Sequence, residues 1–147
     1  MHEPPYSGRF EAGAHLFALR VYFEDTDAGG VVYHANYLRF MERARSDMMR
    51  VAGIDQREAM ESGVGTYVVV EVGMRYKMPA RLDDDLLVVS RVGNMHGALC
   101  AVHQRVMRGQ ETVVEADISV ALIGPSGRPT RQPRHWLETF ERLKGTK

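Results

Sequence analysis

The stretch NYLRFMERARSDMMRVA, residues 36–52, decides the fold. Its apolar side chains recur at steps of three and four residues, which places them on one face of an amphipathic α-helix. Asn36 is expected to cap the helix and Gly53 to end it, because these residue types favour those positions. The apolar face comprises Tyr37, Phe40, Met41, Ala44, Met48 and Val51. Charged side chains occupy much of the remaining surface: Glu42, Arg43, Arg45, Asp47 and Arg50.

Strand-forming residues lie on both sides of this helix. Upstream, residues 15–23 are mostly strand formers, and a loop over 24–30 with three acids and two adjacent glycines separates them from the helix. Directly downstream, Asp55 and Glu58 resemble a capping box for a short second helix, which Gly63 would end.

The second half of the sequence is dominated by strands. The turn-like segment 93–97 and the pair Gly109-Gln110 are expected to connect them. In the last strand apolar and polar residues alternate, which predicts one buried and one polar face. A terminal helix over 134–143 is expected to pack Trp136, Leu137 and Phe140 on the body. The predicted strands cover residues 66–78, 86–92, 99–107 and 111–123.

This order of elements predicts an α+β protein in which a five-stranded antiparallel sheet wraps around one long helix. A single helix cannot cover such a sheet fully, so an edge or a face is left for a partner. We therefore expect a homo-oligomer. Residues 1–13 are rich in Pro, Gly and charge and are predicted to be a flexible tail, and residues 14–147 a single domain.

Composition narrows the classes of function. The 147 residues include 19 basic and 19 acidic side chains, and this zero net charge argues against a general affinity for nucleic acid. The single cysteine, Cys100, allows neither an intramolecular disulfide nor a thiolate metal cluster, which fits a reducing compartment. We find no signal-peptide pattern and no membrane-spanning apolar stretch, so we expect a cytoplasmic protein that is not membrane-embedded.

Reactive side chains are densest in EDTDAGGVVYHANY, residues 24–37. Glycines let a backbone approach a ligand closely, and unpaired N–H groups at a helix start can bind a developing anion. Asp27 and His34 can supply acid–base or nucleophilic chemistry. A calcium loop is excluded because its twelfth position is Asn36 rather than a bidentate Glu. The cluster therefore predicts an active site between the first strand and the long helix.

The run YFEDTDAGGVVYHANY, residues 22–37, resembles the signature of the 4-hydroxybenzoyl-CoA thioesterase family. Glu42-Arg43-Ala44-Arg45 and the segment 79–84, PARLDD, are similar too. Within the family the chain most resembles the acyl-CoA thioesterases encoded with the Tol-Pal envelope system, over roughly residues 16–140. The resemblance implies the hotdog fold, which matches the order of elements expected above.

The resemblance also implies roles for individual residues. Asp27 falls on the catalytic aspartate, and His34 falls on the position whose backbone N–H polarises the thioester carbonyl. A histidine is usual there in the Tol-Pal-associated branch and a tyrosine in the 4-hydroxybenzoyl branch, which argues against an aromatic acyl substrate. Gly30, Val31 and Tyr33 would contact the substrate.

The implied reaction is hydrolysis of acyl-CoA thioesters, with Asp27 as nucleophile or general base and with no metal or redox cofactor. Coenzyme A, or alternatively acyl carrier protein, would carry the acyl group. The resemblance further implies a dimer or tetramer with its active sites at the subunit interface. A non-catalytic module that binds acyl-CoA or acyl carrier protein is the alternative. A hotdog dehydratase fits poorly, because Leu38 stands where its motif needs a glycine four residues after the histidine.

Other residues are assigned more ordinary roles. Asp25 is expected to support the loop structurally, and Cys100 to be a buried thiol. Glu42 is a weaker candidate catalyst, because another hotdog branch uses a helix glutamate. Two groups of basic residues are either solvated or in contact with coenzyme A phosphates: Arg75, Lys77 and Arg81, and Arg128, Arg131 and Arg134.

Overall fold

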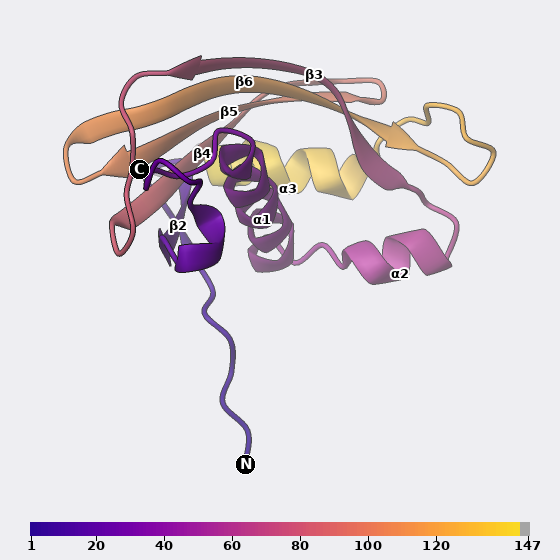
Figure 1. Ribbon diagram of the computed structural model, residues 1–147. Helices are drawn as coiled ribbons and strands as arrows, with labels where there is room; N and C mark the ends of the chain where they lie inside the picture. Colours follow the sequence, from indigo (N-terminus) through magenta and orange to yellow (C-terminus); the bar gives the residue numbers. More distant parts are fainter. Residues whose placement is uncertain (145–147) are drawn as a thin grey trace.

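The computed structural model describes residues 1–144 and shows an antiparallel sheet that arches over helix α1 (Figure 1). The strands are β1 (Arg9–Glu11), β2 (Ala14–Arg20), β3 (Thr66–Tyr76), β4 (Asp85–His96), β5 (Leu99–Arg108) and β6 (Glu111–Ile123). The helices are α1 (Asn36–Val51), α2 (Gln56–Glu61) and α3 (Arg134–Lys144), with a 3₁₀ turn, η1 (Phe23–Asp25). The strand order across the sheet is β1-β2-β4-β5-β6-β3. The predicted wrapping of an antiparallel sheet around one long helix is confirmed.

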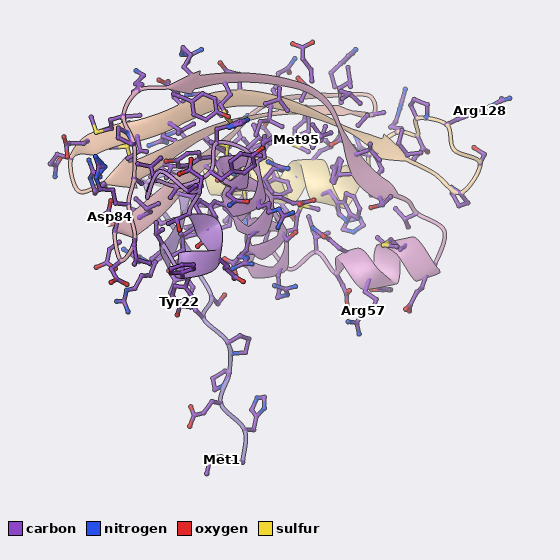
Figure 2. The ribbon with its side chains drawn as sticks, in the orientation of Figure 1. Met1, Tyr22, Arg57, Asp84, Met95 and Arg128 are labelled. Atoms are coloured by element: carbon purple, nitrogen blue, oxygen red, sulfur yellow. The ribbon has the colours of Figure 1, made fainter. Side chains whose placement is uncertain are left out.

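The sheet has six strands rather than the predicted five. The additional strand, β1, lies within the segment that was predicted to be a flexible tail. It forms because Ala12 and Gly13 adopt positive φ angles of 50° and 78°, a tight turn that folds Arg9 back beside Leu16. Residues 9–11 therefore belong to the sheet, whereas the chain near Met1 extends away from the body (Figure 2).

The largest errors in the predicted strand boundaries concern β4 and the first predicted strand. β4 continues to His96 through a bulge between Val92 and Met95, so most of the segment expected to be a turn is strand. The turn itself is centred on Gly97, whose φ of 61° favours glycine. The first predicted strand ends at Arg20, because the following residues form η1.

The predicted capping is right at the end of α1 and wrong at its start. Ala35, not Asn36, occupies the N-cap position, and no side chain caps the helix there. Asn36 is the first helical residue, and its side-chain amide donates to the carbonyl oxygen of Asp25 at 2.9 Å. Gly53 follows the helix with a φ of 84°, as expected of a helix-ending glycine. Asp55 caps α2 by accepting a hydrogen bond from the Glu58 N–H.

The apolar face of α1 packs against the concave side of the sheet, and most of its predicted members are buried. The exception is Val51, which is 37% exposed at the end of the helix. Asp47, predicted on the charged side, is instead buried at 4% exposure. Its carboxylate lies 2.7 Å from Nε2 of His15 on β2, and accepts from the Gly8 N–H at 2.9 Å.

This buried pair fastens the N-terminal segment to the helix. Ser7 also donates to the Asp47 carboxylate, at 3.3 Å. A side chain at Gly8 would meet the Leu16 carbonyl oxygen at 2.2 Å, so the chain passes too close for any residue but glycine. Burial lowers the pKa of His15, and the hydrogen bond and negative charge of Asp47 oppose that shift.

Asp47→Ala is expected to lower the free energy of unfolding by about 3 kcal/mol, because it leaves the buried His15 imidazole without its partner. Urea unfolding followed by circular dichroism measures this value. Asp85→Ala is the matched control, since it breaks an exposed ion pair with Arg20, which solvent screens, and is expected to have a much smaller effect. Equal effects for the two variants would contradict a stabilising role for the buried pair.

The two edges of the sheet differ greatly. β1 is a three-residue edge, whereas β3 is an eleven-residue edge strand. β3 carries a run of exposed valines at positions 68, 69, 70 and 72, each between 38% and 55% exposed. A bulge at Val70 shifts the register of β3 against β6. A long, apolar and unpaired edge is the kind of surface that a partner strand covers.

Candidate active site

The residues between β2 and α1 form a compact loop that closes on itself. The Gly30 N–H donates to the carbonyl oxygen of Asp27 at 3.1 Å, and the Asp27 N–H donates to that of Val31 at 2.8 Å. Gly30 has a φ of 82°, a left-handed conformation in which a larger side chain would be strained. Thr26 and Val32 form a β-bridge below this turn. The turn therefore presents Asp27 beside its tip.

The Asp27 carboxylate is fixed through one of its two oxygens. Oδ1 accepts from the Gly29 N–H at 2.8 Å and from the Val31 N–H at 3.4 Å. Within residues 1–144, Oδ2 accepts no hydrogen bond, and the side chain is exposed. The loop thus holds one oxygen still and leaves the other able to act on a bound molecule.

Asp25 has a structural role in the loop. Its carboxylate accepts from the Tyr22 N–H at 2.8 Å, which stabilises η1. Its carbonyl oxygen accepts from the Tyr33 N–H and from the Asn36 side chain, both at 2.9 Å. The expectation that Asp25 supports the loop is confirmed.

His34 lies in the turn immediately before α1. Within the described chain, neither its backbone N–H nor that of Ala35 donates a hydrogen bond. The His34 carbonyl oxygen accepts from the hydroxyl of Tyr76 at 3.0 Å, which ties this turn to the end of β3. The His34 ring packs 4.5 Å from the ring of Tyr33. The free N–H groups lie at the positive end of the helix dipole, where an anionic oxygen is stabilised.

A second segment, residues 79–84, holds the loop against the body. The Val32 N–H donates to the Ala80 carbonyl oxygen at 2.8 Å, and the Ala80 N–H donates to the buried Tyr37 hydroxyl at 3.3 Å. The Asp84 carboxylate accepts from the Arg81 N–H and from Arg108, and these interactions lower the pKa of Asp84. Asp84 lies at the opposite end of the molecule from Arg128 (Figure 2).

The comparisons with known proteins agree on one family. The profile of the thioesterase superfamily matches residues 29–115. The chain is 39% identical over 129 residues to "Acyl-CoA thioesterase YbgC" of Haemophilus influenzae, which covers 87% of this chain and 95% of that protein. It is 38% identical over 125 residues to "Acyl-CoA thioester hydrolase YbgC" of Escherichia coli, covering 84% and 92%. The chain belongs to the thioesterase superfamily.

A solved structure supports the same assignment for this superfamily member. The probable thioesterase from Bartonella henselae superposes with a TM-score of 0.77 at 37% identity, covering 82% of this chain and 99% of that one. The predicted family and the hotdog fold are thereby confirmed. None of the helices among residues 1–144 combines the length and the apolar character needed to span a membrane.

The structure brings all five predicted site residues of this thioesterase-superfamily protein into the one loop. Asp27 and Gly30 are exposed in the turn, Val31 bridges to Arg81, and Tyr33 and His34 are exposed beside the start of α1. Two supporting tyrosines were not assigned site roles: Tyr37 ends the predicted reactive run but was placed on the apolar face of the helix, and Tyr76 was predicted only as part of a strand. A tyrosine at the end of a long strand gives no local signal of contact with a distant loop, so only the fold reveals it.

Arg75, Lys77 and Arg81, which were proposed to lie near coenzyme A phosphates, differ in the residues that they contact. Arg75 and Lys77 lie 3.6 Å and 3.3 Å from the Glu115 carboxylate. His103 and then Lys77 lower the pKa of Glu115 to about 2. Arg75 and Lys77 are therefore engaged in an ion-pair cluster, whereas Arg81 flanks the loop through its bridge to Val31.

Proposed function

We propose that this protein hydrolyses acyl-CoA thioesters to the free acid and coenzyme A. One observation carries the proposal: a single loop presents the Asp27 carboxylate, with one oxygen free, and the N–H groups of His34 and Ala35, which donate no hydrogen bond within residues 1–144. Hydrolysis of a thioester requires a group that attacks the carbonyl carbon or activates water to do so, and it requires hydrogen-bond donors for the carbonyl oxygen. The names of the curated relatives support the same substrate class.

The chemistry follows from the loop. The thioester oxygen accepts hydrogen bonds from the backbone N–H groups at positions 34 and 35, and the helix dipole stabilises the negative charge that develops there. Oδ2 of Asp27 either attacks the carbonyl carbon or removes a proton from the attacking water. The carbon–sulfur bond then breaks and the sulfur leaves as a thiolate, without a strong general acid. In the route through water this step gives the free acid directly, whereas attack by Asp27 gives a mixed anhydride that a water molecule hydrolyses to the free acid and the regenerated carboxylate. The exposed imidazole of His34 positions the water or the Asp27 side chain.

Residues around the loop position the substrate. Gly30 lets the backbone approach the thioester closely, while Val31 and the ring of Tyr33 flank it. Coenzyme A is the carrier that we propose, and acyl carrier protein is the alternative, because both present the same phosphopantetheine arm. The unpaired Cys100 supports a cytoplasmic location, where such carriers meet a reducing environment.

A non-catalytic acyl-CoA-binding module remains the second candidate. Fold alone does not separate it from an enzyme. The Asp27 carboxylate favours the enzyme, because a negative charge next to a thioester carbonyl contributes nothing to binding. The enzyme and the binding module predict different outcomes for one substitution, Asp27→Asn.

Asp27→Asn is expected to lower kcat by roughly two to four orders of magnitude, because the amide keeps the shape of the side chain and loses its basicity and nucleophilicity. Steady-state release of thiol from a good acyl-CoA measures this, with ligand binding followed in parallel. Glu24→Gln is the matched control: it is an exposed acid in the same loop and is expected to leave turnover unchanged. His34→Ala is expected to have a milder effect than Asp27→Asn. Near-normal turnover of Asp27→Asn would remove this residue from the mechanism.

We also propose that the protein is at least a dimer, joined through β3. The valines of this edge strand are exposed, and the backbone on its outer side has unused hydrogen-bonding groups. Pairing of two β3 strands about a two-fold axis would cover the valines and satisfy these backbone groups. Tyr76, which holds the His34 turn, belongs to the same strand. The proposed dimer therefore places each active-site loop at the subunit interface.

Val70→Lys is expected to convert the dimer into monomers at micromolar concentration, because it places a charged side chain in a desolvated pair of apolar edge strands. Light scattering coupled to size-exclusion chromatography gives the mass. Val51→Lys serves as the control, since Val51 is an exposed valine at the end of α1, away from the β3 edge. A wild-type monomer, or a dimer that survives Val70→Lys, argues against this interface.

No metal or redox cofactor enters the proposed reaction. Among residues 1–144 no group of three or more His, Cys, Asp or Glu side chains is placed to hold a metal ion. Dialysis against a chelator is therefore expected to leave kcat unchanged, and added zinc is expected to give no increase. Loss of activity on chelation with recovery on zinc addition would require a different mechanism.

A further inference from the structure

The two N–H groups proposed to hold the thioester oxygen belong to consecutive peptide groups, and the carbonyl oxygen of each group accepts a hydrogen bond. The His34 N–H shares its peptide group with the Tyr33 carbonyl, which accepts from the Asn36 N–H at 2.8 Å. The Ala35 N–H shares its peptide group with the His34 carbonyl, which accepts from the Tyr76 hydroxyl at 3.0 Å. The first contact is local to the turn, whereas the second comes from a strand residue 42 positions along the chain.

The contact from Tyr76 changes the donor strength of the Ala35 N–H. The peptide bond is conjugated, so a hydrogen bond to its carbonyl oxygen draws electron density from the nitrogen of the same group. The N–H then becomes a stronger donor, as in other chains of hydrogen bonds. Within residues 1–144 the Ala35 N–H donates no hydrogen bond, so the strengthened donor is available to a ligand.

The surroundings of the Tyr76 ring hold its hydroxyl on the His34 carbonyl. The ring lies 6.3 Å from the His34 ring at an interplanar angle of 82°, and 5.9 Å from the buried Tyr37 ring at 64°. Its backbone is paired with Val114 of β6 at the end of β3. Tyr76→Phe keeps the strand pairing and both ring contacts, and therefore removes the hydroxyl alone.

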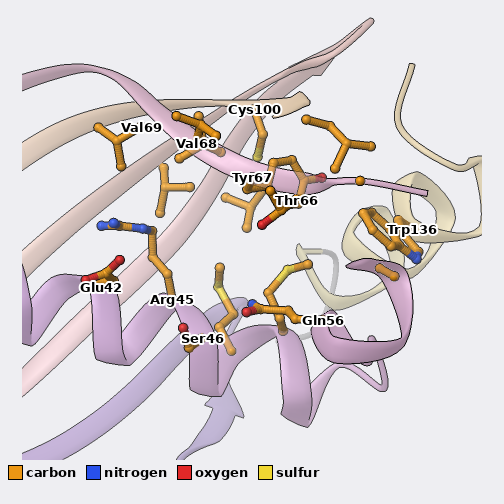
Figure 3. Close-up of a pocket in the computed structure, with 18 of the residues that line it drawn as sticks. Glu42, Arg45, Ser46, Gln56, Thr66, Tyr67, Val68, Val69, Cys100 and Trp136 are labelled. Atoms are coloured by element: carbon orange, nitrogen blue, oxygen red, sulfur yellow. The ribbon is translucent and has the colours of Figure 1, made fainter. Parts of the chain in front are cut away.

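The second tyrosine of β3 serves another part of the molecule. Tyr67 lines a cavity of about 520 Å³ between α1, the start of β3 and α3 (Figure 3). Its hydroxyl donates to the side chain of Gln132 at 2.6 Å. Tyr76 does not line that cavity, and within the described chain its hydroxyl donates only to the His34 carbonyl. One strand thus sends one tyrosine to the C-terminal segment and the other to the active-site loop.

We propose that Tyr76 is a positioning residue for thioester hydrolysis: its hydroxyl polarises the peptide group between His34 and Ala35 and so strengthens the hydrogen bond from the Ala35 N–H to the thioester oxygen. The inference rests on the proposed function. It does not require the proposed dimer, because the tyrosine, the peptide group and Asp27 belong to one chain. The stronger donor matters most when negative charge develops on the oxygen, so Tyr76 acts on kcat more than on substrate binding.

The expected size of the effect follows from the strength of such donors. One donor to a developing oxyanion contributes roughly a factor of 100 to 1,000 in kcat. A further hydrogen bond in the chain strengthens it by about 10–30%. Taken as a fraction of the logarithm of that factor, the Tyr76 hydroxyl contributes about two- to eightfold in kcat.

The first test removes the hydroxyl. Tyr76→Phe is expected to lower kcat about two- to eightfold and to change KM less than about twofold, because the lost interaction is strongest in the transition state. Tyr6→Phe is the matched control: its hydroxyl also bonds the backbone, at the Ala18 N–H, but far from the active-site loop in the sequence and on the other side of β2 from β4. It is expected to leave both constants unchanged. An unchanged kcat for Tyr76→Phe, or a loss confined to KM, would overturn the inference.

The second test separates polarisation from a merely structural tie. Tyr76→3-fluorotyrosine keeps the hydroxyl and makes it a stronger donor, and the assay is run at mildly acidic pH, where the fluorinated phenol keeps its proton. We expect kcat to rise in the order Tyr76→Phe, wild type, Tyr76→3-fluorotyrosine. Tyr6→3-fluorotyrosine is the control for the fluorine atom and is expected to match wild type. A fluorinated variant that is no faster than wild type would show that the hydroxyl only holds the turn.

Infrared spectroscopy separates failure of this inference from failure of the proposed function. An acyl-CoA with a ¹³C-labelled thioester carbonyl is bound to Asp27→Asn, which is expected to retain it, and the carbonyl stretching frequency is measured with and without Tyr76→Phe. Loss of the strengthened hydrogen bond is expected to raise the frequency. A wild type without hydrolytic activity refutes the proposed function, yet this rise would still support polarisation by Tyr76. Equal frequencies in the two proteins would refute the inference whatever the activity.

Discussion

The packing of α1 beneath the arch of the sheet is the contact on which the other features depend. A 16-residue helix is about 24 Å long, whereas the strands β3 to β6 have 10 to 13 residues and run about 33–43 Å. The helix is therefore too short to fill the concave face. At its N-terminus the uncovered space is closed by the loop that carries Asp27, and at its C-terminus by α2 and α3.

The loop can serve chemistry because its own backbone determines its shape. The turn between Asp27 and Gly30 closes through main-chain hydrogen bonds, and the bridge from Thr26 to Val32 fixes its base. Among residues 1–144, the Asp27 carboxylate is consequently held by backbone N–H groups and not by a basic side chain. A counter-ion would screen the charge that the proposed reaction uses, whereas the observed arrangement fixes one oxygen and leaves the other exposed.

Sequence patterns predicted the elements whose causes are local. The period of residues 36–52, the helix-ending Gly53 and the turn at Gly109 depend on neighbouring residues, and the structure agrees with each. The site residues could be proposed from sequence because they lie in one continuous loop with an unusual sequence. Patterns failed where a distant partner decides the outcome. The sequence pattern places Asp47 on the charged surface of the helix, whereas in the structure His15 of β2 packs against it.

The strand errors have the same origin. The additional strand β1 depends on pairing across a two-residue turn and on the attachment of Gly8 to Asp47. The extension of β4 depends on β5, which stays paired with it beyond the bulge as far as His96. Neither interaction produces a recognisable pattern in the sequence of the two affected segments, residues 9–11 and 93–96. In both cases the glycines of the segment led to the prediction of a tail or a turn. Pairing with the neighbouring strand nevertheless makes the segment a strand.

The shortness of α1 also leaves surface uncovered in a single copy, which agrees with the proposed dimer. The ring of Tyr37, at the start of α1, packs 5.9 Å from that of Tyr76, at the end of β3, beside the active-site loop. The other half of β3 rises over the cavity, with valines exposed along its edge. In a single copy the cavity is open, the β3 edge is apolar and exposed, and the Asp27 carboxylate faces solvent. All three lie at or near one strand, so pairing of that strand with a second copy can cover the edge, close the cavity and enclose the site in one step.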